Sequence, residues 1–121
     1  DRSADYNVDS AAKQIIAAER RHELLQRELA QASDTAKADM AQSQLQIKAA
    51  ELQIGASAEV AKLYEMQFKV GRRSLIELVN AYGELASVEV SRVLATSDWR
   101  NAVVNYLHAH AALTDWAQAA R

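Results

Sequence analysis

The amino-acid sequence predicts an all-α protein built as one long antiparallel helical hairpin. Its 121 residues contain no proline and only three glycines, and alanine makes up about a fifth of the chain. Apolar residues recur at steps of three, four and seven, which is helical periodicity. Gly71 interrupts this pattern. We therefore expect a single domain over 1–121, with a helix at about 9–70, a tip at 71–73 and a second helix at about 74–117.

The first segment is expected to begin near Asp9 and Ser10, whose side chains can cap free backbone amides. Its apolar stripe is predicted to form the contact with the second helix, and small residues supply much of its middle. The stripe comprises Ile15, Ala18, Leu25, Leu29, Ala32, Ala36, Met40, Leu45, Leu52, Ala56, Leu63, Met66 and Val70.

The break between the two segments carries the sharpest local signals of the sequence. Gly71 stands where a helix commonly ends in a left-handed residue, and Lys69 in the preceding turn suits the helix C-terminus. Ser74 is followed three residues later by Glu77, the pattern of a capping box at a helix N-terminus. The sequence therefore predicts a tight turn between two helices.

The second segment has a seam at alternating steps of three and four, formed by Leu75, Leu78, Tyr82 and Leu85. Farther along, the predicted contacts are Trp99, Val103, Leu107, Ala111 and Leu113. This segment is shorter than the first, so we expect the far end of the first helix to project beyond its partner.

Composition argues against several classes of function. The net charge is -2 with both signs mixed, which gives no basic footprint for nucleic acid. There is no cysteine, and no apolar run is long enough for a membrane-spanning helix. His108 and His110 diverge by about 200° on a helix and His22 is distant, so no metal site is expected. No catalytic signature is present, and we expect neither an enzyme nor a cofactor.

The stretch from Tyr64 to Ala81 resembles the tip of the second periplasmic hairpin in the TolC family of outer-membrane channel-tunnel proteins. The resemblance is carried by Phe68, the Val70-Gly71 pair, Ser74 and the run Ile76-Glu77-Leu78. Farther on, Asp98-Trp99 and Leu107 are similar to the family's pattern in the returning helix. The likeness covers nearly the whole chain. The family's β-barrel strands and first hairpin are missing, so we expect a fragment of a longer protein.

The resemblance implies a passive conduit located in the outer membrane, with this portion in the periplasm. Three subunits of such a protein form an α-barrel that serves efflux or type I secretion. A periplasmic adaptor and an inner-membrane transporter complete the tunnel. The fragment itself is not expected to span the membrane.

The resemblance also assigns two sets of residues. The adaptor-docking tip consists of Val70, Gly71, Arg72, Ser74 and Leu75, and the periplasmic constriction consists of Phe68, Arg73, Glu77 and Asn80. Phe68 lacks a phenolic hydroxyl and Asn80 carries no charge, which departs from the family's pattern. A simpler interpretation is that Gly71 only ends a helix, Glu77 only caps one and Arg73 is a solvated charge.

Two other functions fit the same hairpin. A periplasmic adaptor (membrane-fusion) protein also contains two long antiparallel helices, in which case the chain is a structural coiled coil. A self-associating helical hairpin is the third possibility.

Overall fold

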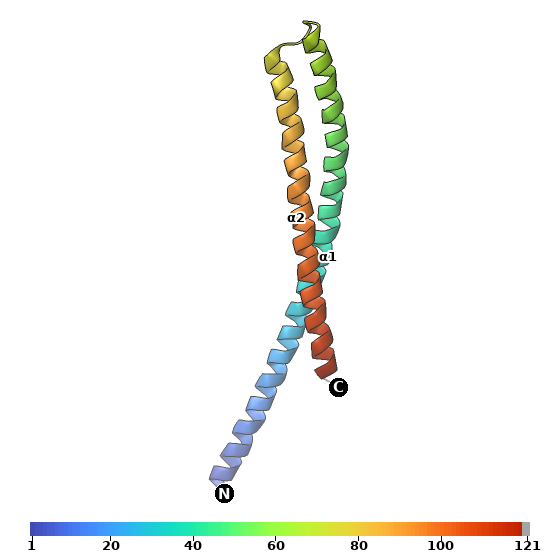
Figure 1. Cartoon of the computed structure of the whole chain (residues 1–121). Helices are drawn as coiled ribbons and strands as arrows, with labels where there is room; N and C mark the ends of the chain where they lie inside the picture. The colour runs from blue at the N-terminus through green and yellow to red at the C-terminus, as the bar shows by residue number, and fades with distance from the viewer. Residues whose placement is uncertain (120–121) are drawn as a thin grey trace. The chain divides into compact units, whose positions relative to one another are not determined.

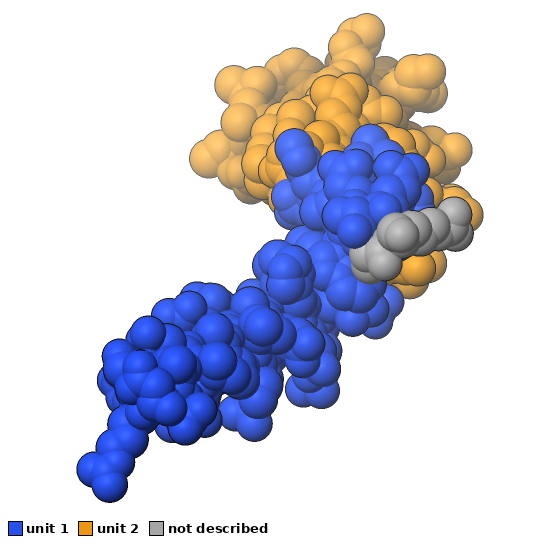
Figure 2. All heavy atoms as spheres, turned by 90° about the horizontal axis from the view of Figure 1, so that it is seen from below, with its two compact units in different colours: residues 1–36, 105–121 blue, residues 37–104 orange. Residues whose placement is uncertain are grey.

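A computed structural model describes residues 1–119 as two long α-helices, α1 (Arg2–Lys69) and α2 (Leu75–Ala119) (Figure 1). No strand occurs among these residues, and the two helices pack against each other. The predicted all-α class and the pair of long helices are therefore confirmed. Contacts divide the chain into unit 1, formed by residues 1–36 and those from 105 onward, and unit 2, formed by residues 37–104 (Figure 2).

The start of α1 differs from the prediction. The helix begins at Arg2, and the side chain of Asp1 accepts a hydrogen bond from the backbone amide of Ser3 at 3.2 Å. Asp9 lies inside the helix, where its carboxylate pairs with Lys13 at 3.3 Å across one turn. The predicted start near Asp9 and Ser10 is wrong, because Asp1 caps the helix eight residues before Asp9. At the other end, α2 begins at Leu75 and runs to Ala119.

Within unit 2, the two helices meet along what we call the inner seam, whose positions alternate between steps of three and four except at Arg92, which is exposed between Val88 and Ala95. On α1 the seam comprises Met40, Ser43, Ile47, Ala50, Ile54, Ser57, Ala61 and Tyr64. On α2 it comprises Leu78, Ala81, Leu85, Val88, Ala95, Trp99 and Ala102. All of these residues are buried or half-buried. This spacing is that of a coiled coil.

Small side chains form the most buried layer of the inner seam. Its buried members are Ser43, Ala50, Ala61, Ala81, Val88, Ala95 and Ala102, and no large side chain of the described residues is fully buried. About half of the seam residues are therefore alanine or serine, which allows the helix axes to approach closely. Each alanine removes little apolar surface from water, so the seam stabilises the pair through close contact along its length more than through large buried side chains.

The predicted seam is partly wrong. Ala36, Met40, Leu78 and Leu85 do face the partner helix. Most of the large apolar residues assigned to the seam in unit 2 are instead exposed: Leu45, Leu52, Leu63, Met66, Val70, Leu75 and Tyr82. Leu52, for example, keeps 79% of its surface. The helical periodicity of these residues is present, but they follow it on a different face of the helix.

Five of these exposed residues lie on a second apolar stripe of α1 in unit 2, and other exposed residues form a second apolar stripe on α2. The outer α1 stripe comprises Leu45, Ala49, Leu52, Ala56, Leu63, Met66 and Val70. The outer α2 stripe comprises Ile76, Val79, Gly83, Ala86, Val90, Val93 and Val104. Each stripe is displaced by two residues from the inner seam, which is about 200° around the helix. Both helices of unit 2 thus carry a second, mostly apolar face nearly opposite the inner seam, interrupted by Glu59 on α1 and by Arg100 on α2.

Unit 1 has buried residues on both helices, namely Ser33 and Ala36 of α1 and Ala109 of α2. Within α2, the rings of Tyr106 and His110, one turn apart, stack at 5.7 Å. Ile15 and Leu25, which were predicted to face the second helix, are 60% and 47% exposed. Among the described residues, no helix is long and apolar enough to cross a membrane.

Candidate functional site at the hairpin tip

The end of α1 is closed by backbone hydrogen bonds around Gly71. The Gly71 amide donates to the carbonyl of Phe68 at 3.0 Å, and the Arg72 amide donates to the carbonyl of Gln67 at 2.8 Å. These two bonds are those of a Schellman motif, in which the residue after the helix adopts a left-handed conformation. Gly71 has φ of 77°, and no other described residue has a positive φ. The glycine predicted to end the helix does so.

The start of α2 is closed by side chains. Ser74 Oγ accepts a hydrogen bond from the Glu77 amide at 3.1 Å, and Glu77 Oε1 accepts one from the Ser74 amide at 3.4 Å. Ser74 Oγ also donates to Glu77 Oε1 at 3.0 Å. This is the reciprocal pattern of a capping box, so the predicted box is present. Both ends of the turn are therefore set by interactions among nearby residues.

Arg73 connects the two helices across the turn. Its Nε and Nη2 donate to Gln67 Oε1 on α1 at 2.9 and 2.7 Å, and its Nη1 donates to Glu77 Oε2 on α2 at 2.6 Å. The guanidinium also lies 3.8 Å from the centre of the Tyr64 ring, a cation–π contact. Its side chain retains 25% of its exposed surface. We call this set of residues (Tyr64, Gln67, Arg73 and Glu77) the tip clasp.

The tip clasp changes the electrostatics of Glu77. The hydrogen bond from Arg73, followed by those from Ser74, lowers the pKa of Glu77 below its ordinary value of 4.5. The hydrogen bond to Glu77 likewise raises the pKa of Arg73. Glu77 is therefore a carboxylate whose charge is largely balanced within the same chain.

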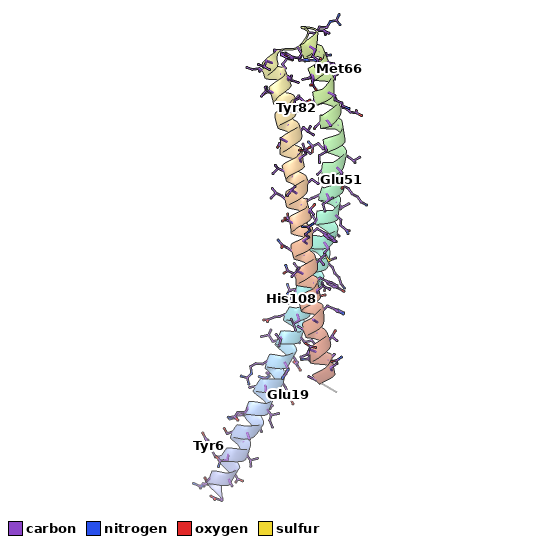
Figure 3. All side chains as sticks on the ribbon, viewed as in Figure 1. Tyr6, Glu19, Glu51, Met66, Tyr82 and His108 are labelled. Carbon is purple, nitrogen blue, oxygen red and sulfur yellow. The ribbon has the colours of Figure 1, made fainter. Side chains whose placement is uncertain are left out.

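A second polar link joins the helices just behind the tip. The hydroxyl of Tyr82 donates to Glu65 Oε2 at 2.8 Å, and Lys69 lies 3.8 Å from Glu65 Oε1. Donation to the Glu65 carboxylate raises the pKa of Tyr82. Tyr82 lies near the closed end of the hairpin (Figure 3). Its ring was predicted for the seam but is 43% exposed, whereas its hydroxyl links α2 to α1.

The residues predicted for adaptor docking divide into two groups. Ser74 and Gly71 build the turn itself. Val70 is 70% exposed and Leu75 is 59% exposed, and the neighbouring Ile76 is 73% exposed. The Arg72 side chain is exposed and makes no polar contact within residues 1–119. The turn therefore presents three apolar side chains and one unpaired cation on a locally fixed backbone.

The residues predicted for the constriction are only partly brought together. Arg73 and Glu77 are in direct contact. Phe68 is 39% exposed, and Asn80 is exposed without a side-chain hydrogen bond inside the described chain. Sequence reasoning did not identify Tyr64 or Gln67 as partners of Arg73. Both residues lie on α1, on the other side of the turn from Arg73, so helical periodicity gives no signal for their contact with it.

No group of three or more histidine, cysteine, aspartate or glutamate side chains that could hold a metal ion occurs in residues 1–119. The shallow hollows of this part of the chain are open to solvent, and one in unit 1 is lined by Glu19, His22, Glu23 and Trp116. No protein-family model matches the chain, and neither a curated protein nor a solved structure is significantly similar to it.

Proposed function

We propose that this chain is a periplasmic tunnel segment of a trimeric outer-membrane channel for efflux or type I secretion, and that it docks an adaptor protein through the hairpin tip. The proposal rests on the resemblance of residues 64–81 to the TolC family, together with the geometry of those residues. In this proposal the adaptor in turn recruits an inner-membrane transporter, and the chain carries no catalytic group.

The observation that carries the proposal is the shape of the tip. The Schellman motif, the capping box and the tip clasp all join residues between 64 and 77, so the turn is fixed by its near neighbours, and Val70, Leu75 and Ile76 remain exposed. Exposed apolar side chains on a rigid backbone bind a partner at a low cost in conformational entropy. Arg72 adds a cation that suits a carboxylate or backbone carbonyl on the adaptor.

The two outer stripes are the second line of support. A free-standing hairpin needs one apolar face on each helix, whereas both helices of unit 2 have two. A helix in the wall of a tunnel contacts a neighbour on either side, which requires two apolar faces. The nearly opposite placement of the stripes suits a row of helices more than a compact bundle.

The tip clasp refines the proposed constriction. Glu77 is paired with Arg73 of its own chain at 2.6 Å, so a ring of three such pairs carries little net charge. Phe68 and Asn80 add no charge to that ring. In this proposal, the closed mouth depends on the position of the Arg73 side chain more than on repulsion between carboxylates.

The test uses the intact gene product in its own cells, with Val70 replaced by the photo-reactive amino acid p-benzoylphenylalanine. We expect irradiation to link the protein to an adaptor, recognised by a helical hairpin between two lipoyl-like halves. A second substitution, Gly71→Asp, should remove the link while leaving the trimer intact. The same probe at Gln44, which is exposed on α1 away from the tip, serves as the control.

Two outcomes would contradict the proposal. Capture of an outer-membrane channel through Val70 would favour the alternative, in which the chain is the structural coiled-coil hairpin of a periplasmic adaptor. Capture of no protein at Val70, with normal assembly of the trimer, would remove the tip as a docking site.

A further inference from the structure

We infer that unit 1 contains a binding site for a small organic cation that carries an aromatic or aliphatic group. The site is a hollow lined by residues of both helices, namely Glu19, His22, Glu23, Trp116 and Ala119. This inference does not depend on the proposed function, because none of these residues belongs to the hairpin tip. It rests on the size of the hollow, its aromatic wall and its two carboxylates.

The hollow has the size of a small-molecule site. Its volume is about 410 Å³, and such sites range from roughly 300 to 1,000 Å³. Glu19, His22 and Glu23 follow each other on α1 at spacings of three and four, so they share one face of the helix. The hollow is open to solvent on one side. A ligand therefore keeps part of its surface in water, which suits a charged group better than a wholly apolar molecule.

Trp116 supplies the aromatic wall of the hollow. Its side chain is half-buried, and an indole ring attracts cations more strongly than any other side-chain ring. Within residues 1–119, no cation lies over this ring and its N–H group makes no hydrogen bond. The ring is therefore available to a ligand.

Glu19 and Glu23 supply the charge. Both are exposed, and neither forms a salt bridge or a hydrogen bond inside the described part of the chain. Because the two carboxylates are four residues apart on one helix, they repel each other. A cation in the hollow relieves this repulsion and is attracted by the indole ring at the same time.

The neighbouring charged residues leave this negative charge in place. Arg20, Arg21 and Arg27 lie in the same part of α1, but none of them lines the hollow or pairs with a carboxylate within residues 1–119. Arg21 lines an adjacent hollow instead. From residue 105 to 119, α2 contains no lysine or arginine, so it brings none to the site.

An organic cation suits the hollow better than a metal ion. Divalent metals require several ligands at fixed distances, and no group of three or more suitable side chains is arranged to hold one among the residues that the structure describes. An ammonium group with alkyl substituents needs only an aromatic face and nearby negative charge.

The test is a titration of the full chain with benzyltrimethylammonium, followed by nuclear magnetic resonance of the two tryptophan indole N–H groups. We expect the signal of Trp116 to shift until it saturates, with a dissociation constant on the order of 1 mM. Trp99 is the internal reference, because its Nε1 atom is buried and lies outside the hollow, so its signal should stay in place. Benzyl alcohol has the same ring without the charge and should bind at least roughly fivefold more weakly.

Two variants separate the contributions of charge and ring. Replacing both carboxylates, by Glu19→Gln with Glu23→Gln, should raise the dissociation constant roughly three- to tenfold. Trp116→Leu should raise it at least about fivefold, measured through the backbone amide signals of residues 19–23.

The matched control is Glu28→Gln with Glu51→Gln. It changes the net charge equally at two exposed positions of α1 outside the hollow, and Glu28 lies about 180° around the helix from Glu19. This control should change the dissociation constant by less than about twofold, because salt screens distant charges. Circular dichroism of every variant checks that the helices form.

Three results would overturn the inference. A Trp116 signal that does not move at any concentration of the cation would show that the hollow is not a site. Equal shifts with benzyl alcohol would show that the hollow binds apolar rings regardless of charge. Equal losses of affinity in the control and in the variant of Glu19 and Glu23 would show that only the net charge of the chain matters.

Discussion

Gly71 shows how a single residue sets the turn. Its φ of 77° lies in the left-handed region, which costs a residue with a side chain about 1 kcal/mol or more. The space around it is open, so a Cβ atom added there would meet no neighbour within 4 Å. The requirement for glycine therefore comes from the backbone conformation and not from crowding.

We accordingly expect Gly71→Ala to lower the free energy of unfolding by about 1 kcal/mol. Gly55→Ala is the matched control, because Gly55 lies inside α1 with the same open surroundings. There the change should raise stability by about 0.5–1 kcal/mol, since alanine favours the helix. Urea unfolding at low protein concentration measures both. Effects of the same sign at the two positions would contradict the argument.

Glu77 links the turn to pH. Its pKa in the folded chain lies below the ordinary value of 4.5, mainly because of the Arg73 hydrogen bond. The unfolded chain therefore binds the proton more readily, and the stability contributed by Glu77 is complete above pH 4.5 and is lost as the pH falls below that value.

We expect Glu77→Gln to lower the melting temperature at pH 7 and to have a smaller effect at pH 3. The midpoint of thermal unfolding, followed by circular dichroism at several pH values, measures this difference. Glu51→Gln is the control, because Glu51 is exposed on α1 and makes no contact with the tip. An equal loss from Glu77→Gln at pH 3 and pH 7 would show that the charge of Glu77 does not contribute.

At the scale of the helices, the inner seam depends on small side chains. Ala61 is 1% exposed, whereas Ala56, on the same helix, is exposed on the outer α1 stripe. We expect Ala61→Leu to destabilise the hairpin by about 1–3 kcal/mol, because the extra methyl groups force the helices apart. Ala56→Leu should change the free energy of unfolding by less than about 0.5 kcal/mol. Urea unfolding at low concentration compares them, and equal costs would argue against close packing at Ala61.

The tip clasp gives a second prediction about the contact between the helices. Arg73→Lys keeps the positive charge but loses the planar group that binds Gln67 and Glu77 and lies over Tyr64. We expect amide exchange at the end of α1 to become on the order of tenfold faster. The neighbouring Arg72→Lys is the control, because Arg72 makes no polar side-chain contact within residues 1–119. Equal exchange in the two variants would show that the clasp does not hold the turn.

The seam also explains which parts of the fold could be predicted. The turn was predicted correctly because Gly71, Ser74 and Glu77 act through near neighbours in the sequence. The residues that face the partner helix were predicted less well because each helix has two apolar stripes. The outer α1 stripe has the larger side chains, among them Leu45, Leu52 and Leu63, and therefore gives the stronger hydrophobic pattern. Alanine and serine at the inner seam give a weak hydrophobic signal. The start of α1 was predicted too late because two possible capping residues stand at Asp9 and Ser10, whereas the helix is capped by the single residue Asp1.

At the scale of the whole chain, much of the apolar surface is on the outside. In unit 2, Leu52, Met66, Val70 and Ile76 each keep more than half of their surface exposed. In unit 1, Tyr6 is 73% exposed. Exposed apolar surface on this scale is typical of a chain that functions in contact with other chains.

Self-association should therefore be visible in the stability of the chain. Anything that binds only the folded state raises the melting temperature with its concentration. We expect the midpoint of thermal unfolding to rise by several degrees over a hundredfold increase in protein concentration. Leu52→Glu should remove this dependence while keeping the helical signal. A midpoint independent of concentration in the unmodified chain would mean that the exposed stripes do not meet in solution.

The self-contained turn also influences how the hairpin forms. The bonds that close it join residues no more than six positions apart, so they can form before the helices have found each other. Contacts between α1 and α2 can then form in order from residue 71 outward, because each new contact shortens the loop that the next one has to close. A hairpin that starts at its own bend reaches the correct antiparallel register with little search, and its open ends are the last to order.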